Sequence, residues 1–150
     1  MESGILYELS SNATISNNYL TNDGISPVAP DIWWGGAIIV NDTNNVEISG
    51  NTVENSMNGI GGYLAPRGDD PETGQPYLLQ NLNVHDNTFN HIQNTAGGII
   101  IEQQAFNNQV FTSWNNHFQN NTLSLSPNAN FVWMNQYYNL AQWLLNLLLH

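Results

Sequence analysis

The chain has 150 residues, with 12 acidic residues, one arginine and no lysine, so its formal net charge at pH 7 is −11. A surface this acidic repels the phosphates of nucleic acids and of anionic lipids, which makes both of them poor partners. The chain contains no cysteine, and this excludes disulfide bonds and thiolate metal sites. Asparagine is unusually abundant and is the most common residue of the chain.

Two short markers recur along the chain and predict a repeat protein. The glycine marker precedes an apolar run at Gly4, Gly36, Gly59 and Gly98, and the asparagine marker lies in short polar turns at Asn18, Asn51, Asn87 and Asn116. The shortest step from glycine to asparagine runs from Gly4 to Asn18, and the shortest return runs from Asn51 to Gly59. Together they give a minimal repeat of about 22 residues, which suits one solenoid coil of three short strands, because helical repeats and propeller blades need about 33 residues or more.

Local patterns agree with short strands. The runs 36–40 and 98–101 are β-branched and follow glycine, as fully buried strands do, whereas 46–48 and 82–84 alternate apolar and polar residues. No stretch before residue 137 shows a sustained helical period.

The asparagine markers predict a stacked ladder. Asparagine tolerates the left-handed backbone of turns, and equivalent turns in a solenoid lie about 4.8 Å apart, within reach of amide-to-amide hydrogen bonds. We expect Asn18, Asn51, Asn87 and Asn116 to form this structural ladder. The alternative is that the asparagines only reflect the number of turns.

Several segments together resemble a known family. They are 4–8 with 13–18, 45–53, 58–61 and 81–87, and the closing segments 133–135 and 140–143. The chain resembles the right-handed parallel β-helix proteins of the pectin-lyase-like superfamily, and among them the secreted bacterial β-helix repeat proteins. The resemblance implies an all-β solenoid of about five coils over 4–136, with a short helical or irregular cap over 137–150. It further implies that 1–150 is one domain, the C-terminal part of a longer solenoid from a secreted or cell-surface protein.

Two insertions interrupt the coils and carry candidate binding residues. Residues 24–35 bring Trp33 and Trp34, and residues 65–77 bring Tyr77. Insertions in solenoids form surface loops, often on one binding face, and a flat aromatic ring can stack on a sugar. The alternative is that the tryptophans pack under their loop and hold it to the solenoid.

Tyr63, Arg67 and Glu102 are the candidate catalytic residues. Counting four residues from each glycine marker aligns Glu8, Val40, Tyr63 and Glu102. In this register Tyr63 and Glu102 lie one coil apart, with Arg67 close by, which suits acid–base chemistry. Glu8 and Glu102 would lie three coils apart, too far for the carboxyl pair of a glycosidase. The alternative is a structural salt bridge from Arg67 to Asp69, Asp70 or Glu102.

The acidic loop residues Asp69, Asp70 and Glu72 could bind calcium through oxygen ligands. Their spacing does not match an ordered calcium loop, so a solvated loop without a cofactor is the favoured interpretation. The histidines show no pair with metal-ligand spacing.

The C-terminus predicts a helical cap over the last coil. Residues 139–149 form the only helix-like stretch, which is too short for a membrane span of about 20 residues. Its leucine-rich end, or the exposed coil ends, could instead form a homo-oligomer contact.

Three functions remain open. The first is a polysaccharide-binding or adhesive module of an extracellular protein, without catalysis in these coils. The second is part of a polysaccharide lyase or glycoside hydrolase, and the third is a purely structural segment. Because Arg67 is the only fixed cation, a neutral glycan suits the chain better than a polyuronate. A fold of this kind does not decide among these functions.

Overall fold

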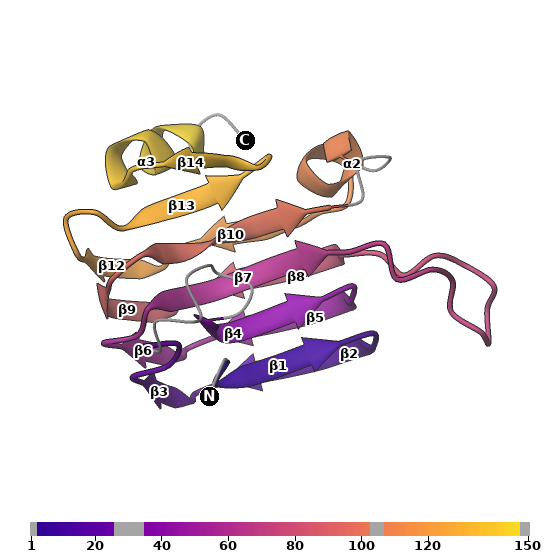
Figure 1. Ribbon diagram of the computed structural model, residues 1–150, viewed down its shortest axis with the longest axis horizontal. Helices are drawn as coiled ribbons and strands as arrows, with labels where there is room; N and C mark the ends of the chain where they lie inside the picture. The colour runs from indigo at the N-terminus through magenta and orange to yellow at the C-terminus, as the bar shows by residue number, and fades with distance from the viewer. Residues whose placement is uncertain (1–2, 26–34, 103–106, 148–150) are drawn as a thin grey trace.

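The computed structural model describes residues 3–25, 35–102 and 107–147 (Figure 1). Within these residues the chain forms short strands and two short helices. The strands are β1 Ile5–Glu8, β2 Ser11–Ser16, β3 Tyr19–Thr21, β4 Gly36–Asn41, β5 Asn44–Ser49, β6 Thr52–Glu54, β7 Asn58–Leu64, β8 Gln80–His85, β9 Thr88–Ile92, β10 Thr95–Ile101, β11 His117–Gln119, β12 Thr122–Leu125, β13 Asn130–Trp133 and β14 Gln136–Tyr138. The helices are α2 Asn107–Thr112 and α3 Leu140–Leu147.

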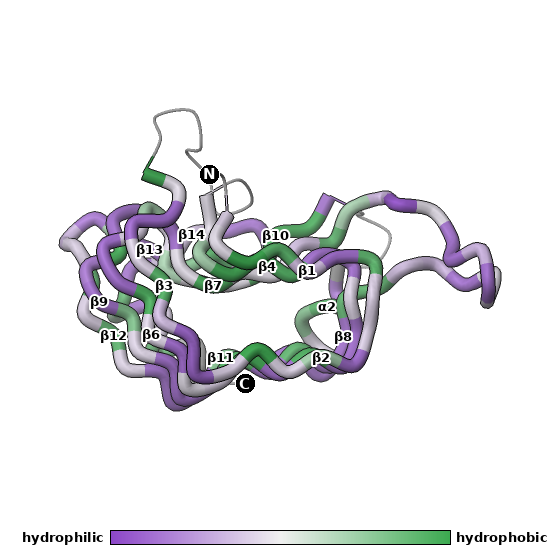
Figure 2. The backbone as a smooth tube through the Cα atoms, turned by 90° about the horizontal axis from the view of Figure 1, so that it is seen from below, coloured by the Kyte–Doolittle hydropathy of each residue, from purple (hydrophilic) through white to green (hydrophobic). Residues whose placement is uncertain are grey.

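The strands stack into three sheets, and the predicted parallel β-helix is confirmed. Sheet A has the order β1-β4-β7-β10-β13-β14, sheet B has β11-β8-β5-β2, and sheet C has β12-β9-β6-β3. All neighbours are parallel except β14, which returns antiparallel to β13. Seen along the stack, the coils superpose (Figure 2). The described residues complete four three-strand coils, and β13 only begins another, so the expected five coils are slightly too many.

The repeat length follows the sequence markers. Ile38 pairs with Ile60, so the coil that contains β4, β5 and β6 has the minimal length expected from the markers. Later coils are longer because they carry insertions, first the loop 65–79 between β7 and β8, then α2 between β10 and β11. The helix α2 was missed by the sequence analysis, because a segment this short cannot show a helical period.

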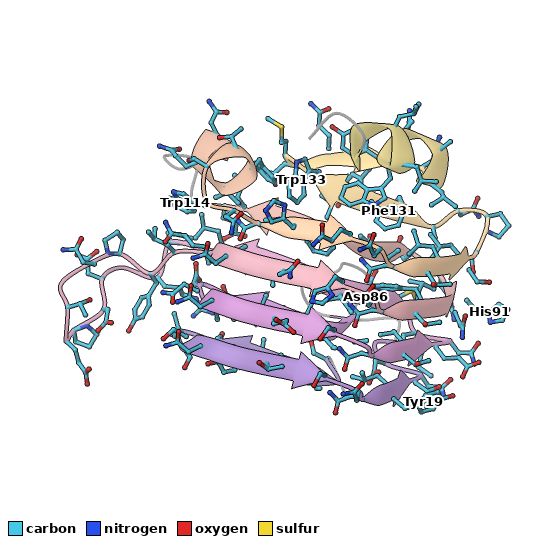
Figure 3. All side chains as sticks on the ribbon, turned by 180° about the vertical axis from the view of Figure 1, so that it is seen from behind. Tyr19, Asp86, His91, Trp114, Phe131 and Trp133 are labelled. Atoms are coloured by element: carbon cyan, nitrogen blue, oxygen red, sulfur yellow. The ribbon has the colours of Figure 1, made fainter. Side chains whose placement is uncertain are left out.

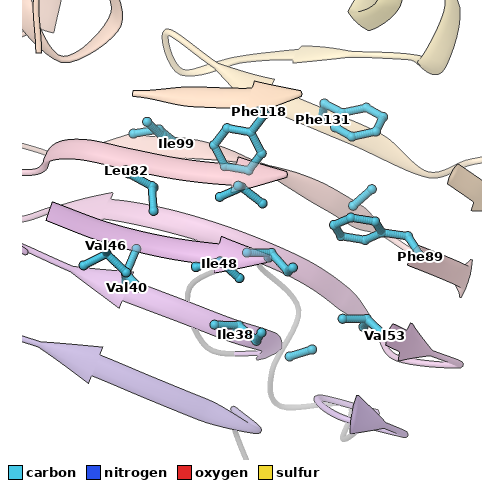
Figure 4. Packing of buried hydrophobic residues seen from close by; sticks show 14 of the residues in the cluster. Ile38, Val40, Val46, Ile48, Val53, Leu82, Phe89, Ile99, Phe118 and Phe131 are labelled. Atoms are coloured by element: carbon cyan, nitrogen blue, oxygen red, sulfur yellow. The ribbon is translucent and has the colours of Figure 1, made fainter. Parts of the chain in front are cut away.

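Apolar residues of successive coils lie on top of one another and form the core (Figure 4). On β5 the burial alternates, so that Val46 and Ile48 point inward while Glu47 points outward. Two continuous inward rows are Ile15, Ile48, Val84 and Phe118 of sheet B, and Leu20, Val53, Phe89 and Leu123 of sheet C. Because an apolar side chain lies above an apolar side chain in each row, every member packs against its counterparts in the coils above and below.

A ladder of asparagines joins the coils at the corner between sheets B and C. The backbone N–H and the Nδ2 of Asn51 both donate to Oδ1 of Asn87, each at 2.9 Å. Nδ2 of Asn51 also donates backwards to the carbonyl of Ile15 at 2.9 Å, so one side chain links three coils. We call this row the inner ladder, and its members are Asn18, Asn51, Asn87 and Asn121.

The prediction that Asn116 is the fourth member of the ladder was wrong. Asn116 is buried elsewhere, where its Oδ1 accepts the N–H of Leu82 at 3.0 Å and its Nδ2 donates to the carbonyls of Leu79 and Val110. Asn116 therefore ties α2 to the stack. Asn121 takes the ladder position, because α2 lengthens its coil and moves the corner further along the chain.

A second row of asparagines lies on the surface at the start of the sheet B strands. Nδ2 of Asn45 donates to Oδ1 of Asn12 at 3.1 Å, Asn81 donates to Asn45 at 2.9 Å, and Asn115 donates to Asn81 at 3.1 Å. All four have positive φ, between 52° and 60°. We call this row the outer ladder. Asparagine is suited to it because it tolerates the left-handed backbone better than most residues.

Gly98 is required by the close approach of β13. Its φ is +127°, and a Cβ at this position would lie 1.8 Å from the carbonyl oxygen of Val132. Any side chain here would push β13 away from β10, so this glycine marker reflects packing and not only turn formation.

The C-terminal helix covers the last coil, as expected. Asn139 and Gln142 cap its first turn reciprocally, since each side chain accepts the other residue's backbone N–H, at 3.0 and 2.9 Å. Trp143 is 4% exposed and stacks on Phe131 with ring centroids 4.7 Å apart. Leu144 and Leu145 are exposed, so an oligomer contact through them stays a prediction. In the part of the chain that the structure describes, every helix is too short to cross a membrane.

Replacing a central rung of the inner ladder should destabilise the fold strongly. Asn87→Ala removes the oxygen that accepts from Asn51 and the nitrogen that donates to the Ile48 carbonyl, so the backbone N–H of Asn51 and the carbonyl of Ile48 lose these partners. Each such group costs about 1–3 kcal/mol, so we expect a loss of about 3 kcal/mol in the free energy of unfolding, measured by equilibrium urea denaturation. The control Asn83→Ala, on the outward side of the same coil, should cost about 0.5 kcal/mol or less. Equal losses in the two variants would contradict the role of the ladder.

Candidate functional site

Ionisable residues from several coils gather where the strands of sheet A end. We call this group the Asp42 cluster, and its members are Glu8, Asp42, Tyr63, Arg67 and Glu102. The register of sheet A brings them together, because Glu8 pairs with Asn41 and Asn41 pairs with Tyr63. Arg67 follows β7 at the base of the 65–79 loop.

The predicted register of this edge was wrong by one residue between β1 and β4 and by two residues between β7 and β10. Tyr63 pairs with Ile100, and Glu8 lies opposite Asn41, where the glycine count had aligned Glu8 with Val40 and Tyr63 with Glu102. The error arises because the glycine markers do not occupy equivalent positions in every coil. Glu102 still reaches Tyr63 by its side chain.

Asp42 has the most unusual environment in the cluster. Its side chain is fully buried, Oδ1 accepts the backbone N–H of Ala65 at 3.0 Å, and Oδ2 lies 3.9 Å from Nε of Arg67. Burial raises the pKa of this carboxyl from 3.8 to about 7, although the Ala65 hydrogen bond and the Arg67 charge oppose the shift. The neighbouring buried atoms Oδ1 of Asn41 and Oγ1 of Thr43 have no hydrogen-bond partner among the described residues, and neither does Oδ2 of Asp42.

Arg67 forms ion pairs, but not with the expected partners. Its Nη2 lies 3.3 Å from Oε2 of Glu8, which also accepts Nδ2 of Asn41 at 3.1 Å. Together with Asp42, this pairing ties the loop to the first two coils. Within the described part of the chain, the predicted alternatives Asp69, Asp70 and Glu102 lie beyond ion-pair distance of Arg67. Arg67 is still 40% exposed, so its contribution to stability is small.

Tyr63 is poorly suited to act as a base. Burial raises the pKa of its hydroxyl, and a side-chain hydrogen bond with Glu102 raises it further. A general base must lose its proton near the working pH, which a raised tyrosine pKa opposes. The structure therefore brings Tyr63, Arg67 and Glu102 into one cluster, yet the raised pKa of Tyr63 suits an anchoring role better than that of a base.

The 65–79 loop projects from the side of the stack as a long, narrow loop (Figure 1). It is closed by a bridge between Asp69 and Pro76 and by the bond from the N–H of Tyr77 to the carbonyl of Gly68 at 3.3 Å. Oδ1 of Asp70 accepts the N–H of Glu72 at 2.8 Å. No group of three metal-binding side chains occurs within 3–25, 35–102 and 107–147. Calcium at Asp69, Asp70 and Glu72 stays the less favoured alternative to a solvated loop without a cofactor. Trp33 and Trp34 lie outside the described residues, and their stacking on sugar stays a prediction.

The outer side of sheet B carries the most regular exposed feature (Figure 3). Beside the outer ladder lie two further rows of polar side chains, each with one member per coil. The rows are Thr14, Glu47, Asn83 and His117, and Ser16, Ser49, His85 and Gln119. We call these rows, together with the outer ladder, the polar face. Most of its groups are hydroxyls and amides, and its His85 lies 3.7 Å from Glu47 and 2.7 Å from Asp86.

Sequence reasoning missed Asp42, Asn121 and the outer ladder. Asn121-Thr122 matches Asn51-Thr52 and Asn87-Thr88, so the Asn-Thr pair was the signal for the ladder position. Asp42 has no such signal, because its burial depends on the loop that returns over it.

The comparison with protein families identifies the fold. A family model described as the right handed beta helix region matches residues 1–140, so the chain belongs to this family. The predicted right-handed parallel β-helix is confirmed, and the match is consistent with the pectin-lyase-like superfamily. No curated protein and no solved structure matches the chain.

The raised pKa of Asp42 predicts a specific pH dependence of stability. In the unfolded chain Asp42 loses its proton near pH 4, whereas the folded protein keeps it up to about pH 7. Its contribution to stability is therefore full below about pH 4 and is lost as the pH rises to about 7. Relative to Asp42→Asn, the unfolding free energy of the wild type should fall by up to about 1.4 kcal/mol per pH unit across this window.

Urea denaturation of both proteins at several pH values measures this difference, in which the titration of the other carboxyls largely cancels. A difference that is constant from pH 4 to pH 7 would show that Asp42 titrates normally.

Proposed function

We propose that this right-handed β-helix is a non-catalytic binding module for an uncharged extracellular polysaccharide, with the polar face as its contact surface. The observation that carries the proposal is the repetition of amides and hydroxyls in three parallel rows. Their spacing along the stack is that of parallel strands, about 4.8 Å. A linear polysaccharide repeats hydroxyl groups along its axis, so a surface that repeats donors and acceptors can bind it at many points at once.

The outer ladder retains hydrogen-bonding capacity for such a ligand. Each amide oxygen can accept two hydrogen bonds. At Asn12, Asn45 and Asn81 the ladder uses one acceptor site of each oxygen, and all three residues are exposed. The interactions within the ladder hold the amides in fixed orientations, which lowers the entropy lost on binding.

Charge supports an uncharged glycan. The net charge is −11, and the single arginine is engaged by Glu8 and Asp42. A polymer of uronic acids would meet net repulsion over the whole molecule, screened beyond about 10 Å at moderate salt. Hydroxyl-rich neutral chains do not meet this barrier.

Removing two side chains from the centre of the polar face should weaken binding. Asn81→Gly keeps a residue that accepts φ of 52°, and Asn83→Ala changes an ordinary strand position on the same coil. Loss of two hydrogen bonds should reduce affinity roughly tenfold or more, measured by affinity electrophoresis against a panel of neutral and acidic polysaccharides. The matched control Thr88→Ala with Asn90→Ala, on sheet C of the same coil, should bind as the wild type does.

Equal losses in the two double variants, or preferential binding of acidic polysaccharides, would contradict the proposal. Trp33→Ala with Trp34→Ala tests the separate prediction that these tryptophans stack on the sugar. Binding lost in that variant alone would move the contact surface from the polar face to the 24–35 insertion.

A carbohydrate-active enzyme is the second candidate, favoured by the pKa of Asp42, which burial raises to about 7. A carboxyl protonated near neutrality has the property of a general acid. Its complete burial argues against contact with substrate. Release of reducing or unsaturated ends from any panel member, abolished by Asp42→Asn and by Arg67→Ala, would establish the enzyme and overturn the non-catalytic proposal.

A further inference from the structure

A cavity of about 200 Å³ lies between the last complete coil and the C-terminal helix. Its lining is largely apolar and aromatic, and residues 119–121 add polar groups. Among its lining residues are Phe89, Phe118, Asn121, Leu123, Phe131 and Trp143. Figure 4 shows three of the rings, Phe89, Phe118 and Phe131, at this end of the core.

The size and walls of the cavity suit a single ring. Phe89, Phe118, Phe131 and Trp143 are each at most 5% exposed, so the walls are set by the packed core. An apolar cavity of about 150 Å³ in another protein binds benzene, which makes about 200 Å³ sufficient for a substituted ring. Leu144, at 49% exposed, lies at the mouth and leaves a path to solvent.

One wall of the cavity is the end of the inner ladder. In the lower coils, the backbone N–H and Nδ2 of each ladder asparagine donate together to Oδ1 of the next one, as Asn87 does to Asn121 at 2.9 and 3.0 Å. At Asn121, Nδ2 donates to the carbonyl of Val84 at 3.0 Å. Among the described residues, no acceptor takes the backbone N–H of Asn121 or the second hydrogen of its Nδ2.

The direction of the ladder places these two donors at its C-terminal end, where Asn121 lines the cavity. Every lower asparagine donates toward the C-terminal end of the stack, and Asn121 is the last member in that direction. Past Asn121 lie Phe131 of β13 and Trp143 of α3, which line the same cavity. An apolar chamber with two convergent donors is the usual arrangement of a small-molecule site.

We infer that this cavity binds a small, uncharged single-ring molecule that carries a carbonyl or carboxamide oxygen. The oxygen accepts from the N–H and Nδ2 of Asn121, as Oδ1 of the next asparagine does in each lower coil. The ring packs against Phe118, Phe131 and Trp143. The net charge of −11 disfavours a carboxylate in place of the carboxamide.

Titration of the ¹⁵N-labelled protein with benzamide, and separately with toluene, tests the inference. Benzamide should cause a saturable downfield shift of the Asn121 amide proton and bind at least tenfold more tightly than toluene, which lacks the oxygen. Leu123→Phe places extra volume in the lining and should weaken benzamide at least tenfold. Leu125→Phe adds the same volume to the same strand outside the lining, and should leave binding unchanged.

Two outcomes would overturn the inference on the wild-type protein alone. One is the absence of a saturable shift at the lining residues with benzamide. The other is toluene binding as tightly as benzamide, which would assign no role to Asn121. Equal weakening by Leu123→Phe and Leu125→Phe in folded proteins would place the ligand outside the cavity.

Discussion

The inner ladder is the interaction on which the stack depends. At the corner between sheets B and C, the backbone N–H groups of the buried residues Asn51 and Asn87 need acceptors, since an unpaired buried amide costs about as much as a lost hydrogen bond. The side chain of the asparagine one coil further along supplies each acceptor, and returns a hydrogen bond to the coil below. The residue before each rung, at positions 17, 50, 86 and 120, has φ between 53° and 65° and turns the chain. At each corner, the residue with positive φ therefore makes the turn, and the asparagine that follows it makes the hydrogen bonds between coils.

Alignment at this corner determines what the outer surfaces present. A slip of one residue in a strand would exchange inward and outward side chains, so a fixed corner keeps Ile48 inside and Glu47 outside. The same alignment places the outer ladder and its neighbouring rows in register, which creates the polar face. Because the corners carry the register, insertions such as the 65–79 loop can leave the stack without disturbing it. The pairing of Arg67 with Glu8 and Asp42 then holds the base of that loop.

Much of the fold could be predicted from the sequence, and the failures have physical causes. The minimal coil length, the buried run of β4 and three ladder members follow from turn chemistry and strand periodicity, which are local. Asn116 was misassigned because α2 adds residues that the markers do not reveal. The partners of Arg67 and the burial of Asp42 depend on how a loop returns over the sheet, which residue spacing cannot specify.

Native-state hydrogen exchange of the ladder amides tests the central claim most directly. The backbone N–H groups of Asn51 and Asn87 have side-chain oxygens as their acceptors, and lie outside the strand ladders. If the inner ladder holds the stack together, these two amides should exchange only on global unfolding, with the same opening free energy as core strand amides such as Ile48. Exchange as fast as in the largely exposed 66–74 segment would show that the ladder opens locally, and that strand pairing and core packing hold the coils without it.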